Sequence, residues 1–133
     1  MYLVDTNVLS ELPRSRPNPK VTRWLESQAT IALSVVSVEE LAFGVARGAA
    51  RRSSLVRWFE ALLESGAPLL DVTPQIARAS GELRAAREAR GRRVAQADML
   101  IAATALVHGL SLATRNVRDF EGCGVTVVNP FSS

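Results

Sequence analysis

The chain is poor in the side chains that carry thiol and imidazole chemistry. Cys123 is its only cysteine and His108 its only histidine. A single cysteine excludes an intrachain disulfide and a cysteine-rich zinc site. A single histidine excludes a ribonuclease that uses a pair of histidines to cleave RNA through the 2′-hydroxyl. We therefore expect a protein of the reducing cytoplasm, with Cys123 in a structural role and His108 at a helix end.

Long apolar runs are also missing, and aromatic residues are few. No stretch reaches the roughly eighteen uncharged apolar residues that a membrane-spanning helix needs. The N-terminus carries Asp5 where a signal peptide would carry basic residues. Aromatic residues make up 5% of the chain, and Trp24, Trp58 and Phe59 lie in expected helices. We expect these rings in the core or in a dimer contact rather than as platforms for bases.

Lysine is almost absent, since Lys20 is the only one, and the net charge of +3 comes from arginine. Arginine suits bidentate contacts with phosphate, but coding bias explains an arginine preference equally well. Two denser basic runs lie in expected helices, where they could line an RNA groove, pair with an acidic partner or form an exposed face. They are Arg47, Arg51, Arg52 and Arg57, and then Arg84, Arg87, Arg90, Arg92 and Arg93.

The length of 133 residues and the apolar content of 47% predict one compact domain covering residues 1–133. Five short runs rich in β-forming residues alternate with segments of helix length. The expected strands are residues 2–4, 31–36, 69–72, 111–114 and 125–128. This alternation implies parallel pairing through right-handed crossovers. The expected fold class is α/β, with a central five-stranded parallel sheet flanked by helices.

Helix boundaries have clear local signals. Asn18 before Pro19 and Thr73 before Pro74 each pair a capping side chain with proline at the first helical position. Gly91 and Gly109 are each expected to end a helix. Within residues 51–63, apolar side chains recur every three or four positions, which predicts a helix with one apolar face for the core or a partner. They are Leu55, Trp58, Phe59, Leu62 and Leu63.

Two acidic residues lie where a carboxylate is costly or well placed for chemistry. Asp5 directly follows the first expected strand, where it could cap the next helix. Asp98 lies near the start of a helix that is apolar on nearly every face, so few orientations leave its charge in water. A first-turn acid that points to solvent and is favoured by the helix dipole is the alternative for Asp98.

Two further acids follow other strands. Glu40 lies at the head of the helix after the second strand, where Ser37 and Glu40 also satisfy a capping box. Asp119 follows the fourth strand and by itself resembles an exposed turn residue. In a parallel sheet, Asp5, Glu40, Asp98 and Asp119 can converge on one edge. Hard oxygen ligands without histidine or thiolate suit Mg²⁺ or Mn²⁺, which would activate a water for phosphodiester hydrolysis.

The same residues resemble the PIN-domain family, and within it the VapC-type toxins of bacterial toxin–antitoxin pairs. The resemblance covers the whole chain and rests on four segments in order. They are Asp5-Thr6-Asn7-Val8-Leu9-Ser10-Glu11, Glu40-Leu41 with Gly44, Ala97-Asp98 before an alanine-rich helix, and Leu112-Ala113-Thr114-Arg115-Asn116 with Asp119-Phe120. The fourth segment continues to a closing Asn129-Pro130-Phe131.

This resemblance implies roles for particular residues. Asp5, Glu40, Asp98 and Asp119 would be the acidic ligands of the metal, some of them through water. Polar residues beside them would support these ligands, namely Thr6, Thr114 and Asn116. The implied activity is endonucleolytic cleavage of RNA, with structured RNAs such as transfer RNA as targets and 5′-phosphate and 3′-hydroxyl ends. The implied partners are a second copy of the chain and an antitoxin whose C-terminal segment covers the active site.

The sequence offers two adjacent glutamates for one ligand position and two readings for a pair of arginines near the last motif. Glu39 precedes Glu40, whereas the family has a small or apolar residue there. Glu40 is chosen because Leu41 and Gly44 follow in the family's pattern, and adjacent helical side chains diverge by about 100°. Arg115 and Arg118 flank the last motif and either contact the RNA backbone or are solvated surface residues.

Rival functions start from the same acids. A phosphatase of the haloacid-dehalogenase type also has an aspartate after its first strand. Such an enzyme needs a second aspartate at the position of Asn7, and it needs a lysine beyond mid-chain. The only lysine of this chain, Lys20, comes early. A receiver domain of two-component signalling is disfavoured for the same reason, because this chain lacks the acidic pair and the late lysine that such a domain needs. The non-enzymatic alternative is a catalytically silent PIN-like module that binds RNA or protein.

Overall fold

The centre of the molecule is a wholly parallel five-stranded sheet. The structure, a computed structural model, describes residues 1–48 and 52–132. Its strands are β1 (Tyr2–Val4), β2 (Ile31–Ser34), β3 (Leu69–Leu70), β4 (Ser111–Ala113) and β5 (Val127–Val128). They lie in the order β3-β2-β1-β4-β5, and every neighbouring pair is parallel. The expected α/β fold class, a five-stranded parallel sheet flanked by helices, is confirmed.

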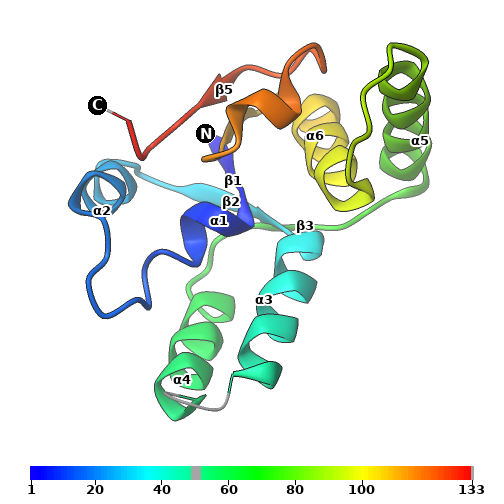
Figure 1. Cartoon of the computed structure of the whole chain (residues 1–133). Helices are drawn as coiled ribbons and strands as arrows, with labels where there is room; N and C mark the ends of the chain where they lie inside the picture. The colour runs from blue at the N-terminus through cyan, green and yellow to red at the C-terminus, as the bar shows by residue number, and fades with distance from the viewer. Residues whose placement is uncertain (49–51, 133) are drawn as a thin grey trace.

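Helices connect and cover the strands (Figure 1). They are α1 (Thr6–Leu9), α2 (Pro19–Glu26), α3 (Val35–Arg47), α4 (Arg52–Leu63), α5 (Pro74–Ala89), α6 (Gln96–His108) and the 3₁₀ helix η1 (Val117–Phe120). In Figure 1, α3 and α4 run side by side below the sheet, and α5 packs beside α6 at the upper right. In the described part of the chain, no helix is both long and apolar enough to cross a membrane.

The two faces of the sheet bury two apolar clusters. Successive strand residues point to opposite faces, so Leu3 and Leu112 join a cluster built on the apolar side of α6, whereas Val4 and Ala113 join a second one. The first cluster holds Leu3, Ala32, Met99, Ile101, Ala102, Ala105, Leu112, Phe120 and Cys123. The second holds Val4, Val8, Leu9, Val21, Leu33, Leu41 and Ala113, with Trp58, Phe59 and Leu62 of α4 packed against it. A sheet covered on both faces is the expected setting for all-parallel strands.

The predicted helix ends are confirmed at four places. The side chain of Asn18 accepts a hydrogen bond from the Lys20 amide, and that of Thr73 accepts one from the Ile76 amide. Gly109 caps α6 with a φ of 66°, and Gly91 follows the end of α5 with a φ of 77°. Glycine suits these positions because it adopts positive φ without a steric cost.

Two local predictions are wrong. The strand expected over residues 31–36 ends at Ser34, because the Ser34 hydroxyl accepts a hydrogen bond from the Val36 amide and caps α3. Ser37 and Glu40 therefore form no capping box, since both lie inside the helix. The helix expected over 51–63 begins at Arg52 in the structure, and Arg51 lies outside the described residues.

The second basic run is not a uniformly solvated face. Arg87 is buried at 5% exposure, while Arg90, Arg92 and Arg93 are exposed. The Arg87 guanidinium packs against Gly122, so this arginine belongs to the contact between α5 and the segment after η1.

Candidate active site

The candidate site forms where β1 and β4 end side by side. The chain proceeds from β1 outward to β2 and β3, then returns to the other side of β1 with β4. This reversal makes the β1–β4 edge the topological switch point, where parallel sheets open a crevice at their carboxyl ends. Asp5 directly follows β1, and Thr114 directly follows β4. The Asp5 amide donates to the Ala113 carbonyl over 2.9 Å, which fixes the two chain segments together.

Asp5 is held by three donors although it is only 4% exposed. Its Oδ1 accepts from the Thr6 amide at 2.7 Å, which makes Asp5 the N-cap of α1. Its Oδ2 accepts from the Thr114 hydroxyl at 2.8 Å and from Asn7 Nδ2 at 3.3 Å. The capping role considered from the sequence is therefore real, but it uses only one of the two carboxylate oxygens.

Burial is the main cause that raises the pKa of Asp5 above its ordinary value of 3.8. The hydrogen bonds from Thr114 and Thr6 act in the opposite direction, because they stabilise the charged form. The negative charges of Glu40 and Asp119 raise the pKa further. Asp5 thus feels two carboxylates that are distant in sequence.

Glu40 reaches this edge through a contact with Thr6. The Thr6 hydroxyl lies 2.6 Å from Glu40 Oε1 and 2.9 Å from the Ser37 hydroxyl. A hydroxyl carries one proton, and the shorter contact to a carboxylate is the stronger one. Thr6 therefore donates to Glu40 and accepts from Ser37. The neighbouring Glu39 is exposed, so it is Glu40 that the structure places beside Thr6.

Asp98 lies in the first turn of α6 and is half-buried. Burial and then the charges of Asp5, Asp119 and Glu40 raise the pKa of its carboxyl to about 6. Among the described residues, no hydrogen bond to Asp98 offsets these effects. A first-turn acid pointing to bulk water would not be perturbed in this way, because solvent would screen its neighbours.

Asp119 lies on η1 and is exposed. Its amide donates to the Asn116 carbonyl over 3.1 Å, and the Asn116 amide donates to the Thr114 hydroxyl over 3.1 Å. Asn116 was expected to act as a polar neighbour of the acids, and its contact in the structure is made by its backbone rather than its side chain. This series of contacts ties the Asp119 segment to Asp5 through Thr114.

Asn7 is part of the site, although no catalytic or binding role was expected for it from the sequence. Its Nδ2 lies 3.3 Å from both Asp5 Oδ2 and Thr114 Oγ1, and its Oδ1 accepts from the Arg115 amide at 3.1 Å. Its place two residues after Asp5, in the first turn of a capped helix, was the available signal. Asn7 connects the β1 end to the β4 end with both halves of its amide.

The four predicted acids are near enough for the charges of Glu40 and Asp119 to raise the pKa of both Asp5 and Asp98. Within residues 1–48 and 52–132, however, no three acidic, histidine or cysteine side chains are already arranged to hold a metal ion. Both findings are consistent with carboxylates that share an edge but point in different directions, with Asp5 and Glu40 bound to neutral donors.

Arg115 and Arg118 are both exposed and lie on either side of Asn116. The guanidinium of Arg115 stacks over the Phe131 ring, 4.7 Å from its centre. The Arg118 carbonyl accepts a hydrogen bond from Arg92 at 2.8 Å. Neither arginine forms an ion pair with a carboxylate of the described residues, so both charges face solvent beside the acids.

Residues 2–122 match the family model described as "PIN domain". The chain is similar to "VapC ribonuclease Y4jK" of Sinorhizobium fredii, with 34% identity over 98% of each protein. It is also similar to "Toxin FitB" of Neisseria gonorrhoeae, with 37% identity over 98% of this chain and 99% of that protein. The structure resembles that of "FitAcB from Neisseria gonorrhoeae", with a TM-score of 0.87, 34% identity and complete coverage of both chains.

Proposed function

The chain belongs to the PIN domain family, and from this premise we propose that it is a metal-dependent endoribonuclease and the toxin of a toxin–antitoxin pair. The observation that carries the proposal is the gathering of four carboxylates at the β1–β4 switch point, where Glu40 and Asp119 raise the pKa of both Asp5 and Asp98. Carboxylates that repel one another are costly to keep together unless a cation is bound between them. Relatives that match nearly the full chain carry the names ribonuclease and toxin.

The donor set fits a hard divalent cation. Four carboxylates with no histidine or cysteine among them match the oxygen ligands that Mg²⁺ and Mn²⁺ prefer. Both oxygens of Asp5 and one oxygen of Glu40 already accept hydrogen bonds that fix their positions. Side-chain rotation of Asp98 and Asp119, or ligation through water, would complete the set. When bound, such a cation lowers the pKa of a water and offsets the charge that builds on the phosphate.

The residues of the chain contribute position and charge. Thr114 and Asn7 hold Asp5, and Thr6 holds Glu40, so two carboxylates stay oriented at this edge of the sheet. The exposed guanidinium groups of Arg115 and Arg118 would contact the RNA next to the reacting phosphate. Charge contacts of this kind make RNA binding weaken as salt increases.

The partners follow from the relatives. The solved structures that the chain resembles include a complex named FitAB bound to DNA, with 34% identity and a TM-score of 0.89. We propose that the chain likewise binds an antitoxin, whose C-terminal segment covers the acids, and that it forms a homodimer. The whole chain, residues 1–133, would act as one nuclease domain in the cytoplasm.

The test is incubation of the purified protein with total cellular RNA and Mn²⁺ or Mg²⁺, followed by sequencing of the cut ends. The proposal expects cuts at a few sites that leave 5′-phosphates and disappear with EDTA. Asp98→Asn should abolish them, whereas Asp71→Asn, the same change at an exposed aspartate after β3, should not. Equal cutting by wild type and Asp98→Asn would refute the proposal. If neither cut RNA while both bound it, a catalytically silent module would replace the nuclease.

A further inference from the structure

A charged cleft includes Arg115, which directly follows Thr114 of the candidate site. It is about 440 Å³ in volume. We call it the arginine cleft, and the residues that matter for its chemistry are Glu11, Arg14, Arg16, Asn18, Arg115 and Phe131. It is formed by the loop between α1 and α2 together with the residues that follow β4 and β5. Three of these six side chains are arginines, and one is a carboxylate.

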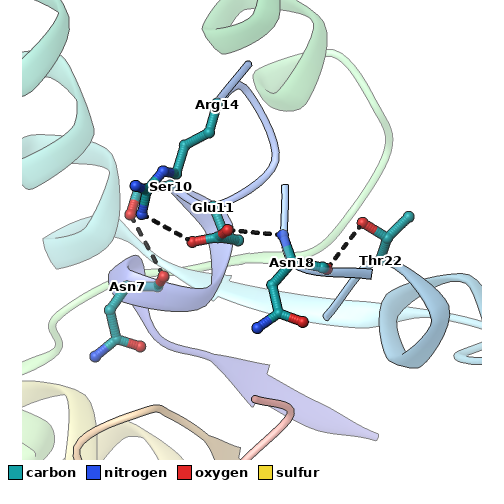
Figure 2. A network of polar contacts seen from close by, with 6 residues as sticks. All are labelled: Asn7, Ser10, Glu11, Arg14, Asn18 and Thr22. Carbon is teal, nitrogen blue, oxygen red and sulfur yellow. Dashed lines mark hydrogen bonds and ion pairs between the residues drawn. The ribbon is translucent and has the colours of Figure 1, made fainter. Parts of the chain in front are cut away.

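The carboxylate stabilises the loop that forms the cleft. Glu11 is only 6% exposed, and its Oε2 accepts from the Asn18 amide at 2.8 Å while its Oε1 accepts from Arg14 at 3.3 Å. Figure 2 shows this network, in which Glu11 lies between Arg14 and Asn18. Asn18 in turn caps α2 and accepts from Thr22 with its carbonyl. The wall of the cleft is therefore held by hydrogen bonds that do not depend on a ligand.

The guanidinium groups carry an excess of positive charge. Glu11 offsets one charge through its contact with Arg14, whose side chain is still 63% exposed. Arg16 and Arg115 are exposed and form no ion pair with a carboxylate in the described part of the chain. A cleft with two uncompensated arginines favours an anion, and a planar guanidinium binds two oxygens of a phosphate at once.

A stacking surface lies in the same cleft. The Asn129 side chain accepts from the Phe131 amide at 2.9 Å, which fixes the turn that presents the ring. The Arg115 guanidinium covers the ring at 4.7 Å. Arginine planes and aromatic rings are the two platforms on which the bases of single-stranded nucleic acids stack. The free face of the Arg115 plane can extend this stack by one base.

The cleft adjoins the candidate active site at Arg115, which directly follows Thr114 in the chain. The Asn7 side chain accepts from the Arg115 amide and donates toward Asp5. Asn7 thus ties the backbone of this cleft residue to the Asp5 carboxylate. A strand whose phosphate reacts at the acids would place an adjacent nucleotide in the cleft.

We propose that the arginine cleft binds one nucleotide of single-stranded RNA next to the scissile phosphate, with its base on Arg115 and its phosphate at Arg14 and Arg16. This inference rests on the proposed function, because it extends the same substrate from the acids into the cleft. An acidic peptide would use the positive charge of the cleft but not its stacking surface, and this difference separates the two ligands in an experiment.

The first measurement is fluorescence anisotropy of a short, unstructured RNA with a 5′-fluorescein, titrated with protein in EDTA so that no cleavage occurs. Arg115→Lys keeps the charge but loses the plane, so it should weaken binding about tenfold. Arg16→Gln should weaken binding and lower the slope of log affinity against log salt by about 0.7, the value for one phosphate contact on a single strand. Arg78→Gln, an equal charge change on the exposed surface of α5, should alter neither the affinity in moderate salt nor the slope.

The second measurement places the base on Arg115. One base at a time is replaced by an abasic site in the same RNA. At one position, the abasic RNA should bind the wild type about tenfold more weakly than the intact RNA does. Arg115→Lys should bind the abasic and the intact RNA equally, because both changes remove the same contact. Phe131→Leu, which keeps apolar packing, should reproduce the Arg115→Lys result, and Phe131→Tyr should restore wild-type binding.

The outcomes separate this inference from the proposed function. The cleft proposal would be overturned if the effects of the abasic site and of Arg115→Lys were additive at every position. It would also be overturned if the cleft variants bound RNA with wild-type affinity. RNA cleavage in the same protein would still support the proposed nuclease. Loss of RNA affinity only through charge, with Arg115→Lys binding as wild type, would overturn the stacking of a base on Arg115. Coupling at one position in a protein that never cuts RNA would support the cleft and refute the nuclease.

Discussion

Replacing Asp98 by asparagine should stabilise the metal-free protein at neutral pH. The ordinary pKa of an aspartate is 3.8, and burial together with the other carboxylates raises that of Asp98 to about 6. Between these values the folded state holds more protons than the unfolded state, so the free energy of unfolding falls as pH rises from about 4 to 6. Above pH 6 the full penalty is present, and asparagine removes it.

The magnitude follows from the size of the shift. A change of about two pKa units corresponds to roughly 3 kcal/mol for a fully buried group. Asp98 is only half-buried, and solvent screening reduces the expected gain to on the order of 1 kcal/mol. Such a gain is measurable, since it is a large fraction of the stability of a domain of this size.

The assay is urea denaturation in EDTA at about pH 7.5 and about pH 4.5, where linkage predicts different penalties. Asp98→Asn should exceed the wild type in stability at the higher pH, and the difference should shrink at the lower pH. Asp71→Asn, an exposed aspartate after β3, is the matched control and should change stability little at either pH. An Asp98→Asn variant equally stable or less stable at neutral pH would refute the electrostatic account of the site.

Two further predictions test the contacts of Thr114 and of Arg87. Thr114→Val removes the hydroxyl that donates to the buried Asp5 carboxylate, so urea denaturation should show a free energy of unfolding lower by about 1–3 kcal/mol. Thr114→Ser keeps a hydroxyl and should lie nearer to the wild type. An unchanged free energy of unfolding in Thr114→Val would contradict a stabilising role for this contact. Gly122→Ala places a methyl group against the buried Arg87 guanidinium at a φ of +80°, whereas Gly124→Ala meets only distant atoms at a φ of +84°. Both variants carry backbone strain of about 1 kcal/mol, but only Gly122→Ala also meets Arg87. Thermal unfolding should therefore show a larger fall in melting temperature for Gly122→Ala. Equal falls would contradict the packing of Arg87.

Much of the fold could be predicted because its signals are local. Runs of β-forming residues marked all five strands, and Asn18 and Thr73 marked two helix starts through their own side chains. The end of β2 was missed because Val35 and Val36 favour a strand equally well, while the cap at Ser34 commits them to a helix. Local propensity could not choose between these states.

The partners of the acids could not be predicted, because they come from other parts of the chain. Ser37 and Glu40 have capping-box spacing, yet both meet Thr6 of α1 across the end of the sheet. Thr114 lies beside Asp5 only because β4 returns to pair with β1, a strand order that element order alone does not fix. The acids themselves were recognisable, since carboxylates after apolar strands carry a cost that sequence reveals.

The central claim is that the four carboxylates bind a divalent cation and that this binding enables RNA cleavage. Its most direct test is a calorimetric titration of Mn²⁺ into the wild type, Asp98→Asn and Asp71→Asn, with RNA cleavage followed over the same Mn²⁺ concentrations. The account predicts that Mn²⁺ binding and cleavage rise together in the wild type and Asp71→Asn, and that both are lost in Asp98→Asn. Cleavage that persists in EDTA, or in Asp98→Asn without Mn²⁺ binding, would contradict it.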